Sequence, residues 1–181
     1  MEYQKTILLK DGRTCVLRNA AERDAQSLLD LFVPTHSQTD YLLTYPDEAA
    51  MTAAQEAVFL KEKAESTDEI ELLAEIGGVP VGSAGISRIG KKAKIRHRAE
   101  FGISVDKAYW RLGIGRALTE AAVECANAAG YAQLELEVVA ENKNALSLYR
   151  SAGFVEYGRN PKAFLSRETG WQELILMRLE L

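Results

Sequence analysis

The spacing of hydrophobic residues changes near the middle of the chain, and this change predicts the centre of the fold. Residues 99–105 alternate apolar side chains with polar or small ones, which is the period of two that a strand requires. Apolar residues then recur at helical spacing at Ile114, Leu118, Ala121, Ala122, Cys125 and Ala129. Gly130 ends this helix, and alternation returns over Ala132–Val139. Strand, glycine turn, helix and strand form a βαβ unit, so the two strands should run parallel.

The remaining elements surround this unit. We expect strands at Thr14–Arg18, Ile70–Ile76, Val79–Ile89, Phe154–Gly158 and Glu173–Leu179. We expect helices at Ala21–Phe32, Asp47–Ser66 and Asn142–Ala152. The pair Gly77-Gly78 supplies the positive φ angles of a tight hairpin, so neighbouring strands are antiparallel there. The chain is therefore predicted to be α+β, with a mixed, mostly antiparallel central sheet of about six or seven strands.

Length and charge limit the organisation and the partners. With 181 residues and no repeat or linker, the chain is expected to form one domain over residues 1–181. A net charge of −4 gives no basic field for a nucleic-acid backbone. Because no apolar run approaches about 18 residues and the start is too polar for a signal peptide, we expect a cytoplasmic protein without membrane association. Cys15 and Cys125 lack metal-ligand spacing, so no metal site is predicted, and Cys125 is expected in the core.

A glycine-containing loop before the long helix is the predicted phosphate site. It comprises Arg111, Leu112, Gly113, Ile114, Gly115 and Arg116. Glycines let a ligand approach the backbone closely, and the unpaired N–H groups of a helix N-terminus favour an anion. A P-loop would need Lys and Ser or Thr after Gly115, and a dinucleotide fingerprint would need a small residue where Leu118 stands. The loop therefore predicts an anion site that is neither a P-loop nor a dinucleotide-binding fingerprint.

Several short blocks follow one another from residue 105 to residue 154. They are Val105, Trp110-x-x-Gly113-x-Gly115, Glu137, Asn142-x-x-Ala145 and Leu148-Tyr149-x-x-x-Gly153-Phe154. In this order and spacing they resemble the GNAT superfamily of N-acetyltransferases. Weaker agreement at Leu17–Ala20 and Asp24 extends the resemblance over essentially the whole chain. Trp110 is a departure, because the family usually has Arg or Gln there.

The resemblance implies a GNAT-like fold with helices on both faces of the sheet and a splayed parallel pair of strands. It also implies an acyltransferase that uses acetyl-CoA as cosubstrate, with direct attack by an amine in a ternary complex and neither metal nor covalent intermediate. The implied cofactor contacts are Ile103, Ser104, Val105, the loop from Arg111 to Arg116, Asn142 and Tyr149. Asn142 also opens a predicted helix as a favoured N-cap residue, and both roles can coexist.

Two residues are implied as catalytic groups. A phenol with a reference pKa of about 10 stays protonated at neutral pH, so Tyr149 can protonate the departing thiolate, although its spacing also suits simple packing. A base must take a proton from the acceptor ammonium. Alternation along Leu134–Val138 puts Glu135 and Glu137 on one side of their strand, so geometry does not choose between them. The resemblance favours Glu137, with Glu100 on the neighbouring strand as a second candidate.

The acceptor is the least constrained part of the prediction. The family's acceptor loops correspond to two segments, one with Thr39, Asp40, Tyr41, Tyr45 and Glu48, the other the late loop Arg159–Gly170. Acidic and aromatic side chains suit a cationic amine, on a small molecule or on a protein. Exposed sheet edges would also allow a homodimer.

Two functions of other classes stay open from the residues alone. A noncatalytic acyl-CoA-binding module would keep the glycine loop and need no proton donor. A binding protein for an acidic partner would use the segment Arg88–Arg98, which has no acidic residue, although a solvated hairpin tip has the same composition. His36 and His97 have no Ser, Cys or Asp at motif spacing, so no hydrolase triad is predicted.

Overall fold

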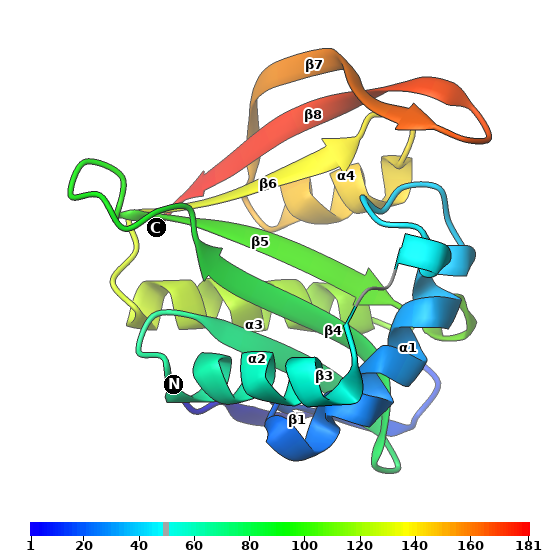
Figure 1. Ribbon diagram of the computed structural model, residues 1–181, viewed down its shortest axis with the longest axis vertical. Coiled ribbons are helices and arrows are strands. Elements are labelled where there is room, and N and C mark those ends of the chain that lie inside the picture. The colour runs from blue at the N-terminus through cyan, green and yellow to red at the C-terminus, as the bar shows by residue number, and fades with distance from the viewer. Residues whose placement is uncertain (49–50) are drawn as a thin grey trace.

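Strands with one apolar face each join into a single continuous sheet in the computed structural model, which describes residues 1–48 and 51–181 (Figure 1). Over these residues the sheet has eight strands in the order β1-β2-β3-β4-β5-β6-β8-β7. The strands are β1 Gln4–Leu8, β2 Thr14–Asn19, β3 Ile70–Ile76, β4 Val79–Arg88, β5 Arg98–Val105, β6 Gln133–Val139, β7 Val155–Ser166 and β8 Gly170–Glu180. Only β5 and β6 pair in parallel within the described residues. The α+β prediction with a mixed, mostly antiparallel sheet is confirmed, and the strand count exceeds the predicted six or seven.

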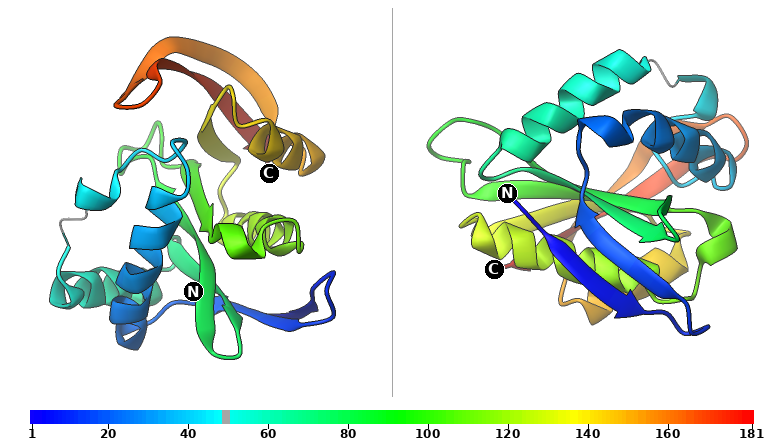
Figure 2. Two further views of the ribbon diagram at one scale, coloured as in Figure 1. Left: turned by 90° about the vertical axis from the view of Figure 1, so that its right-hand side faces the viewer. Right: turned by 90° about the horizontal axis from the view of Figure 1, so that it is seen from below.

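Helices cover both faces of the sheet, as expected (Figure 2). α1 (Ala25–Ser37) and α2 (Ala53–Glu65) lie on one face, and α3 (Ile114–Ala128) and α4 (Lys143–Ser151) lie on the other. The apolar side of α3 packs into the core, where Cys125 is 2% exposed. Cys125 is therefore a core residue, as predicted. Among the described residues, no helix is both long and apolar enough to cross a membrane.

The beginning of the chain differs from the prediction in two ways. β1 was not predicted, because it is an edge strand whose side chains are mostly polar and exposed, so it lacks an apolar alternation. The first helix starts at Ala25 and runs to Ser37, so it includes Pro34, which we expected in a loop. Pro34 has no N–H to donate to the carbonyl of Asp30, so the helix loses one main-chain bond there, and its own carbonyl accepts the N–H of Gln38 at 3.1 Å.

The second helix is shorter than the predicted range Asp47–Ser66. It begins at Ala53, because Thr52 and Gln55 bond reciprocally: the Gln55 N–H donates to Thr52 Oγ1 at 3.3 Å and the Thr52 N–H donates to Gln55 Oε1 at 2.9 Å. Pro46–Glu48 form a separate 3-10 turn. Residues 49–50 of the predicted range lie outside the described residues.

The predicted late loop Arg159–Gly170 is mostly strand. β7 continues to Ser166 and β8 starts at Gly170, so only residues 167–169 form the turn. The loop was expected from the position of the family's acceptor loops, and Asn160-Pro161 within it is also typical of a turn. The structure accommodates Pro161 in an irregularity of the β7–β8 pairing between Asn160 and Phe164.

The parallel pair β5–β6 opens along its length. Its register contains only three pairs, from Arg98 opposite Gln133 to Glu100 opposite Glu135. Beyond these pairs, β5 continues beside β4 as far as Val105, and β6 continues beside β8 as far as Val139. The predicted splayed pair is confirmed, and the two strands form a wedge that widens toward their C-terminal ends (Figure 1).

Candidate active site

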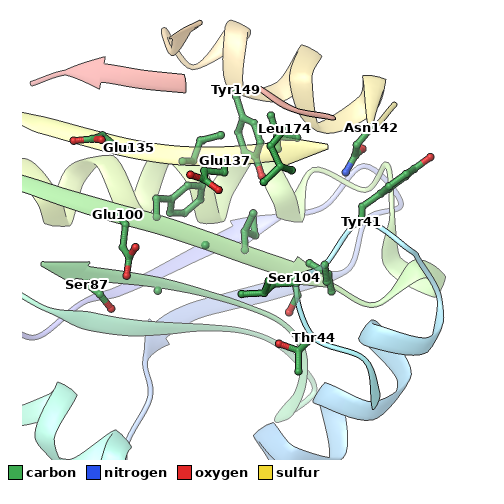
Figure 3. A pocket seen from close by; sticks show the side chains of 18 of the residues that line it. Tyr41, Thr44, Ser87, Glu100, Ser104, Glu135, Glu137, Asn142, Tyr149 and Leu174 are labelled. Atoms are coloured by element: carbon green, nitrogen blue, oxygen red, sulfur yellow. The ribbon is translucent and has the colours of Figure 1, made fainter. Parts of the chain in front are cut away.

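A cavity of about 830 Å³ occupies the wedge between β5 and β6 (Figure 3). Its walls include four of the predicted cofactor residues: Ile103, Ser104, Asn142 and Tyr149. Val105 is not among the lining residues, and its carbonyl accepts the Trp110 Nε1–H at 2.6 Å. The residue that departs from the family pattern therefore fixes the end of β5.

The glycine loop lies outside this cavity, where β5 passes into α3. Gly113 is the N-cap of α3 with φ 104°, and Arg111 also has a positive φ, of 64°. The first main-chain bond of the helix is from Ala117 N–H to the Gly113 carbonyl at 3.0 Å. The N–H groups of residues 114–116 thus lack intrahelical partners and face outward, as an anion site requires.

The flanking arginines of this loop differ in their contacts. Arg116 donates to Ser151 Oγ at 3.3 Å, which links the start of α3 to α4. Arg111 makes no ion pair among the described residues. Both remain available as positive charges near the helix N-terminus.

Tyr149 reaches the cavity from α4. Its ring packs edge-on against Phe101, with centroids 6.2 Å apart, and lies 6.0 Å from the ring of Phe154. Burial raises the pKa of Tyr149 to about 12, so the phenol is protonated at neutral pH. Tyr149 lines the cavity, and Glu137 is another of the residues in the cavity wall (Figure 3). Packing and proton donation, the two roles that the sequence left open, are therefore compatible.

The structure separates the two glutamates that the sequence could not. Arg98 donates from Nε and Nη2 to the two carboxylate oxygens of Glu135 and lowers the pKa of that carboxyl. Tyr157 also donates to Glu135, at 3.2 Å. Glu137 makes no ion pair in the described part of the chain and lines the cavity, as Tyr149 does, whereas Glu100 points toward Ser87 (Figure 3). Of the two glutamates of β6 in the cavity wall, Glu137 is thus the one whose carboxylate forms no ion pair among the described residues.

Asn142 serves as the N-cap of α4. Its Oδ1 accepts the Ala145 N–H at 3.2 Å, so the capping role is present. Its amide nitrogen points toward the cavity (Figure 3) and stays available as a donor.

The predicted acceptor residues divide into lining residues and anchors. Tyr41 lines the cavity, together with its neighbours Leu42, Leu43 and Thr44. Asp40 instead accepts hydrogen bonds from the β7–β8 hairpin, and the Tyr45 hydroxyl accepts the Arg167 N–H at 2.8 Å. Glu48 accepts from Arg167 at 3.3 Å. These anchors hold the loop over the cavity.

A second hollow of about 500 Å³ lies beside the same loop. Thr39, Asp40 and Tyr41 line it together with Trp110 and Trp171. Tyr41 therefore borders both hollows. From the predicted late loop, only Phe164 reaches the larger cavity.

Sequence reasoning missed the far end of the larger cavity. Glu71 of β3, with Ser83, Gly85 and Ser87 of β4, lines it on the side away from β6. Burial raises the pKa of Glu71 to about 7, against the opposing effects of the Lys63 ammonium and the Ser83 hydroxyl. The available signal was a glutamate within an otherwise apolar strand, Ile70-Glu71-Leu72-Leu73, facing a strand rich in Gly and Ser.

Comparison with known proteins identifies the family. The sequence model of the acetyltransferase (GNAT) family matches residues 26–154 of the chain. The N-alpha-acetyltransferase RimI of Mycobacterium tuberculosis is 41% identical over 85 residues, which are 47% of this chain and 51% of that protein. The chain thus spans about half the length of this curated relative.

Solved structures share the fold over nearly the whole chain. A GNAT acetyltransferase from Streptococcus pneumoniae superposes with a TM-score of 0.88 and 29% identity, covering 92% of this chain and 99% of that one. The structure of yncA from Salmonella typhimurium, solved with its cofactor acetyl-CoA, has a TM-score of 0.80 at 20% identity, covering 92% and 94%. With the family description matched over most of its length and the wedge between β5 and β6 in place, the chain belongs to the GNAT family of acetyltransferases.

Proposed function

We propose that the chain is an acetyl-CoA-dependent N-acetyltransferase in which an acceptor amine attacks the thioester directly, within a ternary complex. The observation that carries this proposal is the wedge between β5 and β6, with Tyr149 and Glu137 together at its wall. The name of the M. tuberculosis relative and the acetyl-CoA in the Salmonella structure support the same chemistry.

The chain offers a binding path for the cosubstrate along two elements. The outward N–H groups of residues 114–116 suit the diphosphate, with Arg111 and Arg116 as nearby charges. The free edge of β5 at Ile103 and Ser104 suits the amide-containing pantetheine arm, because alternate main-chain groups there have no β6 partner. The thioester supplies the activated acetyl group.

The residues at the wedge divide the proton transfers. Glu137 accepts a proton from the acceptor ammonium, which leaves a neutral amine to attack the carbonyl carbon. Unpaired N–H groups of β5 stabilise the negative charge on the carbonyl oxygen, and such donors are often worth about 3 kcal/mol each. Tyr149 then donates its proton to the sulfur as the C–S bond breaks and the carbonyl re-forms. The nitrogen, now bonded to the acetyl carbon, loses its second proton, which restores the Tyr149 phenol. No covalent link to the protein is needed.

Thiol release from acetyl-CoA over a panel of amines tests the proposal. We expect amine-dependent turnover, with kcat lowered at least about 10²-fold in Tyr149→Phe and in Glu137→Gln. Tyr149→Phe keeps the ring that packs on Phe101. Tyr131→Phe is the matched control, because that buried hydroxyl has no hydrogen-bond partner among the described residues and does not line the cavity.

Three outcomes separate the candidate functions. Turnover that needs an amine supports the transferase. Acetyl-CoA binding without thiol release from any amine supports a noncatalytic module and contradicts the proposal. Absence of binding contradicts both and leaves the basic segment 88–98, although Arg88 and Arg98 of that segment already pair with Asp68 and Glu135.

A further inference from the structure

The floor of the cavity beside the wedge is a row of two glycines that ends at a glutamate. Glu71 of β3 lies opposite Gly85 of β4, and Gly85 lies opposite Gly102 of β5. Residues directly opposite one another in a sheet share a face. All three line the cavity, so the row forms a trough that leads from the wedge across two strands to the Glu71 carboxylate.

The rows on either side of the trough are also small or polar. Ser83 lies opposite Ser104, and Ser87 lies opposite Glu100. These four residues line the cavity as well. The trough is therefore bordered by hydroxyl groups and a second carboxylate rather than by apolar side chains.

The two glycines leave room for different things. A β-carbon on Gly102 would meet no atom within 4 Å, so the space above it is free. A β-carbon on Gly85 would lie 2.5 Å from Glu71 Oε2. The carboxylate therefore occupies the place where any other residue at position 85 would put its side chain.

The charge of the cavity is not balanced by the protein. Among the described residues, Glu71, Glu100 and Glu137 line the cavity and form no ion pair. Arg98 is paired with Glu135, and burial lowers the pKa of His36, which keeps that ring neutral.

Lys63 does not neutralise Glu71 by contact. Its Nζ donates to the Ile86 carbonyl at 3.1 Å and to Ser87 Oγ at 2.5 Å, and its ion pair, at 3.9 Å, is with Glu69. A cationic ligand would supply the charge that is missing at the end of the trough.

We infer that the trough is a subsite for the distal end of the acceptor, where Glu71 binds the second ammonium group of an aliphatic diamine whose first amino group is acetylated at the wedge. This inference rests on the proposed function. The Glu71 carboxylate lies over Gly85 of β4, and the wedge lies on the far side of β5. The two ends of the acceptor are therefore more than one interstrand spacing of roughly 5 Å apart, which a chain of about eight methylene groups spans.

A small acceptor fits this subsite better than a folded protein does. The loop residues Tyr41–Thr44 line the same cavity, and Asp40 ties that loop to β8 through Gln172 Nε2 at 2.9 Å. The cavity volume of about 830 Å³ is in the range of small-molecule sites.

Two isosteric amines test the subsite in the thiol-release assay. 1,8-Diaminooctane carries the second ammonium, and 8-amino-1-octanol replaces it with a neutral hydroxyl. We expect the wild type to have at least a tenfold higher kcat/KM for the diamine. Glu71→Gln should abolish this preference through KM while it leaves kcat/KM for the amino alcohol within twofold. Glu120→Gln on the exposed side of α3 is the matched control and should change neither value.

A second variant, Gly85→Ala, keeps the negative charge of Glu71 but shifts the position of its carboxylate. The β-carbon of Gly85→Ala displaces the Glu71 carboxylate, so the diamine preference should fall here too. If turnover is present but the ratio of kcat/KM for the diamine to kcat/KM for the amino alcohol is the same in wild type and in Glu71→Gln, the subsite is overturned. The proposed transferase activity is then unaffected.

Failure of the proposed function has a different signature. If no amine gives thiol release, the transferase is contradicted, and calorimetry of 1,8-diaminooctane with wild type and Glu71→Gln still decides the subsite. Tighter binding by the wild type supports it, and equal or absent binding overturns it.

Discussion

Two glycines of the α3 loop are needed for different reasons. Gly113 has φ 104°, a conformation that costs other residues roughly 1–2 kcal/mol. Gly115 has an ordinary φ, and a β-carbon there would meet only Leu148, at 3.5 Å. The fold therefore does not require its small size, which agrees with the proposed approach of the diphosphate to the helix N-terminus.

This difference gives a prediction for paired variants. Gly115→Ala should unfold at the same or a slightly higher urea concentration than wild type, because alanine is favoured over glycine in a helix, yet bind acetyl-CoA about tenfold more weakly. Gly113→Ala should unfold at a lower urea concentration than wild type, because alanine is strained at the positive φ of this position. Urea denaturation and calorimetry measure the two effects, and unchanged affinity in Gly115→Ala would argue against diphosphate binding at this loop.

Glu71 makes stability depend on pH in an uncommon direction. Its pKa is raised from 4.5 to about 7, mainly by burial, with Lys63 opposing and Glu56 reinforcing the change from α2. The folded chain therefore holds a proton that the unfolded chain has lost between these two pH values. The contribution of this group to the free energy of unfolding falls as pH rises through that window, by up to roughly 3 kcal/mol.

Glu71→Gln removes this titration. We expect its free energy of unfolding, relative to wild type, to rise between pH 5 and pH 8. Glu100 and His36 line the same cavity and are unchanged by the substitution, so they cancel in the comparison to first order. A difference that stays constant from pH 5 to pH 8, measured by urea denaturation, would show that Glu71 titrates normally in the folded chain.

At the scale of elements, the loop over the cavity depends on one carboxylate. Asp40 accepts from Ser166 Oγ at 2.6 Å, Thr169 Oγ1 at 3.0 Å and Gln172 Nε2 at 2.9 Å. These bonds attach the loop segment that contains Tyr41 onto the β7–β8 hairpin. The hairpin thus positions a loop that is distant from it in sequence.

Asp40→Ala should loosen this loop without touching the glycine loop of α3. We expect KM for the acceptor to rise several-fold while the Kd of acetyl-CoA stays within twofold of wild type. Asp11→Ala, in an exposed turn that does not line the cavity, is the control. An equal loss of affinity for both substrates would mean that the loop supports the whole site and not the acceptor side alone.

The wedge itself is a property of the sheet as a whole. β5 and β6 can separate because each keeps another partner, β4 for one and β8 for the other, so no strand loses all of its main-chain bonds. The core is continuous beneath the opening, where Phe101, Tyr149 and Phe154 pack together.

Local sequence patterns predicted the elements that carry local signals. The alternation at 99–105 and the helical spacing from Ile114 predicted the βαβ unit of β5, α3 and β6. Gly77-Gly78 predicted the hairpin of β3 and β4. Edge strand β1 lacked such a signal because its residues are polar. Only the first part of β7 was predicted, as Phe154–Gly158, because Asn160-Pro161 interrupts the pattern.

Parts of the site that depend on register could not be predicted. Residues 71, 85 and 102 form one row only because three strands pair in a particular alignment, which no short stretch of sequence specifies. The choice between Glu135 and Glu137 likewise depended on Arg98, which is 37 residues from Glu135 in the chain.

A crystal structure of the chain with acetyl-CoA tests the central claim most directly. We predict that the diphosphate lies within hydrogen-bonding distance of the main-chain nitrogens of residues 114–116. The pantetheine arm should lie between β5 and β6, with the sulfur beside Tyr149. A diphosphate bound elsewhere, or a wedge closed by direct pairing of β5 with β6 beyond Glu100, would contradict it.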